Sequence, residues 1–305
     1  MLKTSLIIGA CFLALAPHSI ARADNTARLD TAAIEAATGL KGTLNKKENV
    51  FKVSKPRTDV PTSIAAWKIP PFMGLTSWAA FTPTHDGMTV MMGDTVLFED
   101  EVNPVMSVAL DNGLDVTALH NHFFFDQPKV YFMHIGGTGD AAALAAAVKK
   151  VYGKVAEIRT AHPEPQNDFE GGHIGSPNHI SGAPLEKILG YHGQAKDGMF
   201  KVVIGRTAAM HDTSIGNEMG INTWAAFAGT DDQAVVDGDF AMKESELQTV
   251  LKAMRHNGIN IVAIHQHMSM EQPRILFLHY WGLGKAEELA QSLTKVLQAQ
   301  STTSN

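Results

Sequence analysis

The stretch MGLTSWAAF at positions 73–81 recurs as MGINTWAAF at positions 219–227, and this internal repeat decides the fold. Farther along the chain, residues 120–137 align with residues 265–282 at a constant offset of 145, with seven of eighteen positions identical. Self-similarity over such a length indicates that the chain contains two copies of one folding unit.

We place copy one at residues 34–157 and copy two at residues 185–299. A chain of 305 residues, 45% of them hydrophobic, is long enough to bury two domain cores. The segment between the copies, residues 158–184, is rich in proline, glycine and polar residues, which is typical of a linker. Because it is long and contains histidines, this segment could also cover a site.

Copy two shows the secondary-structure pattern most clearly. Its apolar periodicity and turn residues predict a strand at 224–227, a strand at 234–240, a helix at 245–257, a strand at 260–265, a strand at 274–280 and a helix at 286–298. This β-β-α-β-β-α order favours an α+β fold, in which antiparallel sheets carry helices on one face. A ferredoxin-like arrangement fits the order, and two equal copies favour packing about a pseudo-twofold axis. The order of the strands in the sheet does not follow from the pattern.

The first 23 residues have the three parts of a secretory signal peptide. Lys3 supplies positive charge, residues 5–17 form an apolar core, and residues 21–23 (Ala-Arg-Ala) form a small-x-small cleavage site. We therefore expect a periplasmic or secreted protein, cleaved after Ala23. No stretch reaches the ~20 apolar residues of a membrane span, so we expect no transmembrane segment. Apolar residues continue well past Cys11, so we do not expect it to be lipidated.

Charge and cysteine content exclude several classes of function. The net charge is −6, and loss of Lys3 and Arg22 with the leader makes it about −8, which argues against a nucleic-acid partner. Since Cys11 is the only cysteine, the mature chain has no disulfide, thiol nucleophile or cysteine-based zinc site. Any metal must therefore be held by histidine, aspartate or glutamate. The small-molecule or envelope ligand and the oligomeric state remain open.

Each copy carries a His-x-His pair followed by a carboxylate and a Gln-Pro dipeptide. The residues are His120, His122 and Asp126 in copy one, and His265, His267 and Glu271 in copy two. Because residues i and i+2 of a strand point to the same face, both imidazoles of a pair can aim at one cation. The carboxylate can fold back as an oxygen ligand and leave positions open for water. This chemistry suits a divalent metal, with zinc as the first expectation and iron, manganese or copper as alternatives.

Two further histidines and the comparison of the copies refine this expectation. If the Gln-Pro dipeptide closes a hairpin, His134 and His279 lie more than ~12 Å from their pairs, so we treat them as secondary candidates. Asp126 is one methylene shorter than Glu271, so the two sites are expected to differ in affinity or occupancy. A pseudo-twofold axis could instead bring both pairs to one shared site.

The competing interpretation is a hydrogen-bonded histidine network that orders the hairpin without a metal. The residues between histidines and carboxylate change from FFF at 123–125 to MSM at 268–270, while the polar residues on either side are kept. Packing alone does not account for that contrast, which favours the metal interpretation.

Other repeated polar residues have simpler interpretations. Gly93-Asp94 and Gly238-Asp239 fit a turn at a strand end, although their carboxylates could reach a neighbouring site. Glu101 and Glu246 fit the first turn of a helix, where a carboxylate interacts with the helix dipole. Arg57 and Arg206 could grip an anionic ligand, but we expect each to pair with a carboxylate.

The repeated motifs resemble those of the LppY/LpqO family. The resemblance rests on TWAAF at 223–227, IHQHM at 264–268 and RILFLHYWG at 274–282, with LHNHF at 119–123 and FMHIGG at 132–137 in copy one. It covers nearly all of the mature chain. It implies an exported bacterial protein, sometimes a lipoprotein, and it implies no known activity.

These observations lead to an expected function. We expect an exported metal-binding protein as the leading interpretation, and a metal-dependent hydrolase is one form that it could take. In that interpretation His265, His267 and Glu271 hold a cation that polarises a carbonyl or activates water. Alternatively, Glu271, or Asp126 in copy one, stays unligated and acts as a general base. The rivals are a non-catalytic metal- or ligand-binding protein and a structural module of the cell envelope.

Overall fold

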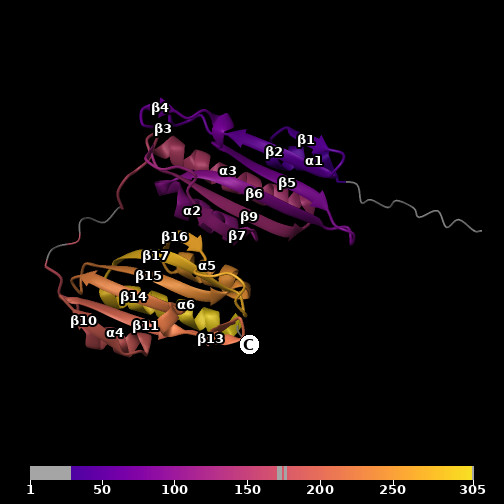
Figure 1. Cartoon of the computed structure of the whole chain (residues 1–305). Coiled ribbons are helices and arrows are strands. Elements are labelled where there is room, and N and C mark those ends of the chain that lie inside the picture. The colour runs from indigo at the N-terminus through magenta and orange to yellow at the C-terminus, as the bar shows by residue number, and fades with distance from the viewer. Residues whose placement is uncertain (1–28, 170–173, 175–176, 304–305) are drawn as a thin grey trace, which may run out of the picture.

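The computed structural model describes residues 29–169, residue 174 and residues 177–303 (Figure 1). The expected signal peptide, residues 1–23, and its Cys11 lie outside the described residues. In the described ranges no helix has both the length and the apolar character needed to cross a membrane.

Copy one contains three helices, one short 3-10 helix and nine strands. These are α1 Thr31–Thr38, β1 Gly42–Asn45, β2 Val50–Pro56, β3 Ser63–Ile64, β4 Trp67–Lys68, η1 Pro71–Met73, β5 Thr76–Pro83, β6 Thr89–Phe98, α2 Glu99–Asp111, β7 Asp115–His120, β8 Asp126–Gln127, β9 Val130–Gly139 and α3 Ala141–Ala161.

Copy two repeats the same succession with small differences. Its elements are α4 Gly182–Leu189, β10 Gly193–Lys196, β11 Met199–Gly205, β12 Ala208–Met210, β13 Thr213–Ile215, η2 Asn217–Met219, β14 Asn222–Gly229, β15 Ala234–Lys243, η3 Glu244–Glu246, α5 Leu247–His256, β16 Asn260–His265, β17 Ile275–Gly284 and α6 Ala286–Thr303.

Twelve of the strands form one sheet with the order β1-β2-β5-β6-β9-β7-β16-β17-β15-β14-β11-β10. Outward from the junction of β7 and β16, the order passes through equivalent strands of the two copies. The copies are therefore related by a pseudo-twofold axis at this junction. Figure 1 shows the two halves of the sheet meeting at these strands. The predicted α+β class, with antiparallel sheets and two tandem copies, is confirmed.

The junction between the copies is built from equivalent contacts. Leu119 of β7 pairs with Ile264 of β16. On one side Asn103 of α2 exchanges two hydrogen bonds with the backbone of Ile261, at 3.1 and 2.7 Å. On the other side Gln248 of α5 makes the equivalent pair with the backbone of Val116, both at 2.9 Å. Side-chain amides therefore satisfy the backbone groups where β7 and β16 diverge, which spares buried polar groups the cost of lacking a partner.

The helices pack against one face of the sheet. Alternate residues of the strands, such as Phe81 and Phe227, are fully buried and share one core cluster with Val148 of α3 and Val296 of α6. Burial of alternate residues is expected for antiparallel strands with one buried face. The cluster spans both copies. The opposite face carries polar residues together with a smaller apolar cluster in each copy. Each copy also has a lysine over a tryptophan there, and Lys201 lies 4.0 Å from the ring centre of Trp224.

Local signals fix the ends of the central helices in both copies. Glu101 accepts a hydrogen bond from the backbone of Phe98 at 2.8 Å, and Glu246 accepts one from Lys243 at 2.9 Å, so each caps the start of its helix. Gly258, with φ of 76°, follows the last turn of α5, as the sequence predicts. The first-turn interpretation of the two glutamates is confirmed.

The repeated unit is longer than the predicted one. The run β5, β6, α2, β7, β9, α3 follows the predicted β-β-α-β-β-α order, but α1, β1 and β2 precede it, and short strands cap the loops. Six strands of each copy enter the main sheet, which extends beyond a four-stranded ferredoxin-like arrangement. The pattern missed β1 because a short, largely exposed edge strand carries little apolar alternation. It also left β2 out of the unit, although Phe51 and Val53 of this inner strand are buried at alternate positions.

Candidate metal centre

Three side chains of copy two converge on the open face of the sheet. Asp239, His265 and His267 each offer a ligand atom, and these atoms lie within 4.8 Å of one another. Nε2 of His267 is 3.1 Å from Oδ2 of Asp239, and Nε2 of His265 is 3.5 Å from Oδ1 of the same carboxylate. Two imidazole nitrogens and one carboxylate oxygen are a donor set that divalent transition metals accept.

The strand register explains why these residues meet. Asp239 on β15 pairs with His279 on β17, and His279 pairs with Ala263 on β16. His265 lies two residues beyond Ala263 and therefore points to the same face. His267 follows directly after β16. The cluster thus combines one carboxylate from β15 with two imidazoles carried two strands away.

Hydrogen bonding orients the lone pair of His267 toward the carboxylate. Its Nδ1 lies 3.1 Å from the carbonyl oxygen of Gly220, which only an N–H on that nitrogen can satisfy. In the neutral ring Nε2 is then a bare lone pair 3.1 Å from Oδ2 of Asp239. Two electron-rich atoms at this distance repel unless a cation, either a proton or a metal ion, lies between or beside them. A backbone acceptor on the remote ring nitrogen is also the usual partner of metal-bound histidines.

Two atoms of the cluster lack any other partner. Oδ1 of Asp239 and Nε2 of His265 are buried and make no hydrogen bond within the described part of the chain. Burial of such groups without a partner is costly, so each is expected to have a ligand.

His279 lies beside the cluster, and the sequence-based distance was wrong. Its ring centre is 4.5 Å from that of His265, with an angle of 16° between the rings, instead of more than 12 Å away. Residues 266–274 form a wide loop rather than a tight hairpin, and His265 pairs with Phe277, so His279 is its diagonal neighbour across the strands. Nδ1 of His279 is 3.3 Å from the carbonyl oxygen of Gly238.

The predicted carboxylates Glu271 and Asp126 are placed differently from the expectation. Oε1 of Glu271 accepts a hydrogen bond from the backbone of Ile275 at 3.0 Å, and Oδ2 of Asp126 accepts one from Val130 at 2.6 Å. Both side chains are buried and brace the loops that lead into β17 and β9. Among the described residues neither belongs to the three-residue cluster.

The carboxylate that does reach the histidines is Asp239, which the sequence interpretation treated as part of a strand-end turn. That interpretation was wrong, because Asp239 lies in the middle of β15 and is 3% exposed. A signal was present: the Gly-Asp dipeptide recurs in both copies within a largely buried strand, where a carboxylate is costly to bury without a partner. Gly238 itself is required, since a Cβ there would lie 2.2 Å from the Tyr280 ring.

Copy one holds the equivalent residues in a looser arrangement. The ring centres of His120 and His122 are 5.2 Å apart, and those of His120 and His134 are 5.1 Å apart. Burial raises the pKa of Asp94, against the opposing effect of the three neighbouring histidines, and burial lowers the pKa of His122. In the described residues no ligand triplet of copy one meets the 4.8 Å limit satisfied in copy two.

The two groups of histidines do not form one shared site. The cluster of copy two includes no residue of copy one within the described chain. Asp94 is on β6 and Asp239 on β15, and four strands of the main sheet separate these two. Each histidine pair therefore faces the carboxylate of its own copy.

The recurring arginines pair with carboxylates, as expected. Arg57 binds Glu101 through two nitrogens, at 2.7 and 3.0 Å, and Arg206 binds Glu246 at 2.8 and 3.2 Å. Both pairs lie at the start of a central helix.

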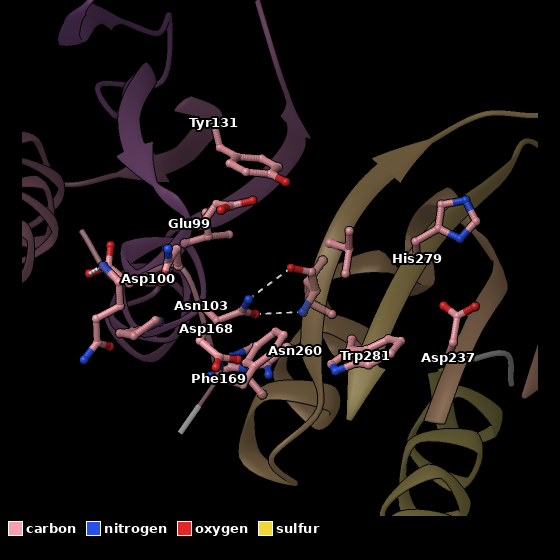
Figure 2. Close-up of a pocket in the computed structure, with 17 residues that line it drawn as sticks. Glu99, Asp100, Asn103, Tyr131, Asp168, Phe169, Asp237, Asn260, His279 and Trp281 are labelled. Atoms are coloured by element: carbon pink, nitrogen blue, oxygen red, sulfur yellow. Dashed lines mark hydrogen bonds between the residues drawn. The ribbon is translucent and has the colours of Figure 1, made fainter. Parts of the chain in front are cut away.

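A cavity of about 700 Å³ lies at the junction of the copies, next to the cluster (Figure 2). Copy one contributes the start of α2 and Tyr131, and copy two contributes Asp237, His279 and Trp281 from β15 and β17. Residues 166–169 of the segment between the copies also line it. Figure 2 shows His279, Trp281 and Asp237 on one side and Tyr131 and Glu99 on the other. This volume is in the range of small-molecule sites.

Fold and site together define an α+β protein of two tandem copies with a candidate metal centre on the open face of copy two. The chain belongs to the family described as Domain of Unknown Function (DUF1259), whose model matches residues 32–154 and 183–299. This match supports an uncharacterised domain in two tandem copies, and the name LppY/LpqO is not part of it. A search of curated protein sequences returns no match.

Two solved structures show a distant likeness. One is the trimeric bacterial microcompartment shell protein PduB, at 9% identity and a TM-score of 0.19, covering 85% of this chain and 89% of that one. The other is EtuB from Clostridium kluyveri, at 11% identity and a TM-score of 0.21, covering 87% of this chain and 91% of that one. Scores this low carry no argument about function or assembly.

Proposed function

We propose that this protein binds one divalent transition-metal ion through Asp239, His265 and His267. The observation that carries the proposal is the approach of Nε2 of His267 to Oδ2 of Asp239 at 3.1 Å, with Nδ1 tied to the Gly220 carbonyl. A lone pair aimed at a carboxylate is the arrangement expected of a ligand pair that shares a cation.

The chemistry of such a centre follows from its donor set. Three protein ligands leave coordination positions for water and for a second molecule, as in catalytic zinc sites. Zinc fits a set of two imidazoles and one carboxylate, and the same set suits non-haem iron, manganese or copper. A bound ion of this kind lowers the pKa of coordinated water and polarises carbonyl groups, which supports metal-dependent hydrolysis as the leading activity.

The cavity supports access of a small molecule to this centre. His279 lines the cavity and stacks on His265. Only the imidazole ring of His279 would therefore separate a ligand in the cavity from the histidine that holds the proposed ion. Nδ1 of His279 faces the Gly238 carbonyl, which leaves Nε2 available to accept or donate a proton. If Nε2 of His279 joins the ion instead, coordination closes, and the protein would bind metal without catalysis.

Elemental analysis of the protein purified without a histidine tag tests the metal proposal. We expect one equivalent of zinc, iron, manganese or copper per chain, and loss of that equivalent in the His265→Ala/His267→Ala variant. The matched control is His120→Ala/His122→Ala, which removes the same side chains from copy one and should retain the metal. Circular dichroism establishes that each variant is folded. Absence of metal from the wild-type protein, before and after titration with these ions, would refute the proposal.

We also propose that the protein works outside the cytoplasm. The support is the signal-like sequence of residues 1–23 alone, since this segment lies outside the described structure. Mass spectrometry of the protein from a periplasmic fraction should give a chain that begins at Asp24. A chain that retains its leader and stays in the cytoplasmic fraction would contradict this proposal.

A further inference from the structure

The cavity at the junction has an excess of negative charge. Its lining includes the carboxylates Glu99, Asp100, Asp168 and Asp237, and Arg255 is the positively charged residue among them. Glu99, Asp168 and Asp237 form no ion pair with a lysine or arginine within the part of the chain that the structure describes. Carboxylates that face a cavity without a basic partner attract positively charged ligands.

One of these carboxylates is buried with an unused oxygen. Asp100 has an 8% exposed side chain, and its Oδ2 pairs with Arg159. Its Oδ1 is buried and makes no hydrogen bond among the described residues. A buried acceptor without a partner is costly, so a donor from a ligand in the cavity would satisfy it.

Arg255 offsets one of these negative charges, and its guanidinium is held by neutral groups of the protein. Its guanidinium donates to the hydroxyl of Ser107 at 3.1 Å, to the carbonyl of Ile259 at 2.8 Å and to Oδ1 of Asn260 at 2.7 Å. Burial lowers its pKa to about 10, so it stays charged at neutral pH. These bonds commit most of its donors to the protein, and they hold it against α2 and the start of β16.

The lining of the cavity also includes three aromatic side chains. Phe169 and Trp281 have ring centres 6.5 Å apart with 15° between their planes, and Tyr131 lies on the opposite side (Figure 2). Burial and the nearby carboxylates of Glu99 and Asp126 raise the pKa of Tyr131, so its ring stays neutral. Aromatic faces attract ammonium and guanidinium groups through their quadrupoles.

We propose that this cavity is a binding site for an organic cation, a small molecule with an ammonium or guanidinium group on an apolar or planar body. The cationic group faces Asp237, Asp168 and Glu99, and the body lies against Trp281 and Phe169. The site is built from both copies and from residues 166–169, so the pseudo-twofold axis does not generate a second one. In copy one Met92 and Gly136 occupy the positions equivalent to Asp237 and Trp281.

Titration calorimetry with benzylammonium and with benzoate tests this proposal. The two probes share an aromatic ring and carry opposite charges. The titrations use the full mature chain in the presence of a chelator, so the result does not depend on the metal proposal. We expect one molecule of benzylammonium per chain, bound at least tenfold more tightly than benzoate.

Three variants locate the bound probe. Asp237→Asn and Trp281→Ala should each weaken benzylammonium binding at least fivefold. Asp115→Asn is the matched control, because it removes one exposed carboxylate outside the cavity and should leave binding unchanged. Equal affinity for both probes, stronger binding of benzoate, or no binding of the cation would overturn the proposal. Binding that survives both cavity variants, or that falls equally in the Asp115 control, would also overturn it.

Discussion

Replacement of Glu101 by alanine is expected to lower the free energy of unfolding by about 3–5 kcal/mol. Glu101 is fully buried and accepts hydrogen bonds from two nitrogens of Arg57 and from the backbone of Phe98. It also contacts Arg159 at 2.8 Å. Its removal leaves two buried guanidinium groups with too few partners and uncaps α2, and both changes destabilise the folded state.

Chemical denaturation followed by circular dichroism measures this effect. The control is Glu99→Ala, which removes an exposed carboxylate from the same helical turn and should cost no more than about 1 kcal/mol. A loss below 1 kcal/mol for Glu101→Ala would show that the network contributes little. The equivalent change in copy two, Glu246→Ala, should be strongly destabilising as well, since Glu246 is also fully buried and bound by Arg206.

Replacement of Asp239 by asparagine is expected to weaken metal binding by roughly 100-fold or more, since loss of an outer-sphere partner alone costs 10–100-fold. The amide keeps the shape of the side chain but removes its negative charge and leaves one neutral oxygen. Asp239 is the carboxylate within reach of both histidines, and its Oδ1 has no other partner in the described residues.

Competition titration against a chromophoric chelator gives the affinities, with Asp94→Asn as the matched control. Asp94 is the equivalent residue of copy one, so the two variants have the same charge change on equivalent strands. We expect Asp94→Asn to leave the tight site intact. Equal losses in both variants would mean that the copies contribute equally, and no loss in Asp239→Asn would remove Asp239 from the site.

The fold was predictable from the sequence as far as local patterns reach. The repeat at 73–81 and 219–227 and the apolar periodicity predicted the two copies, the α+β class and the central helices. The apolar periodicity and the repeated motifs are patterns within short stretches of the chain, so they can be recognised in a single sequence. The strand order was not predictable, because the pairing of β7 with β16 joins residues 145 positions apart and leaves no local pattern.

The site was predictable in part. The spacing of His265 and His267 placed both imidazoles on one face because strand alternation is local. The sequence pointed to Glu271 rather than Asp239, because Glu271 follows the histidine pair closely in the chain. Its hydrogen bond to the backbone of Ile275 cannot be recognised from the sequence. Asp239 comes from a strand paired across β17, and that register exists only in the folded sheet.

The position of His279 illustrates the same limit. A Gln-Pro dipeptide after a strand is typical of a tight turn, and a tight turn would have carried His279 away from the pair. The loop at 266–274 is instead wide, and the bridge between Ala209 and Gln272 ties it to the β12–β13 hairpin. This long-range contact holds the loop in its wide conformation, and His279 therefore lies beside the cluster.

Anomalous diffraction from crystals of the mature protein grown with zinc tests the central claim most directly. The account predicts one strong peak on the open face of copy two, about 2.0–2.2 Å from a carboxylate oxygen of Asp239 and from Nε2 of His265 and His267. A peak bound through Glu271, a peak confined to copy one or to surface histidines, or no peak at all would contradict it.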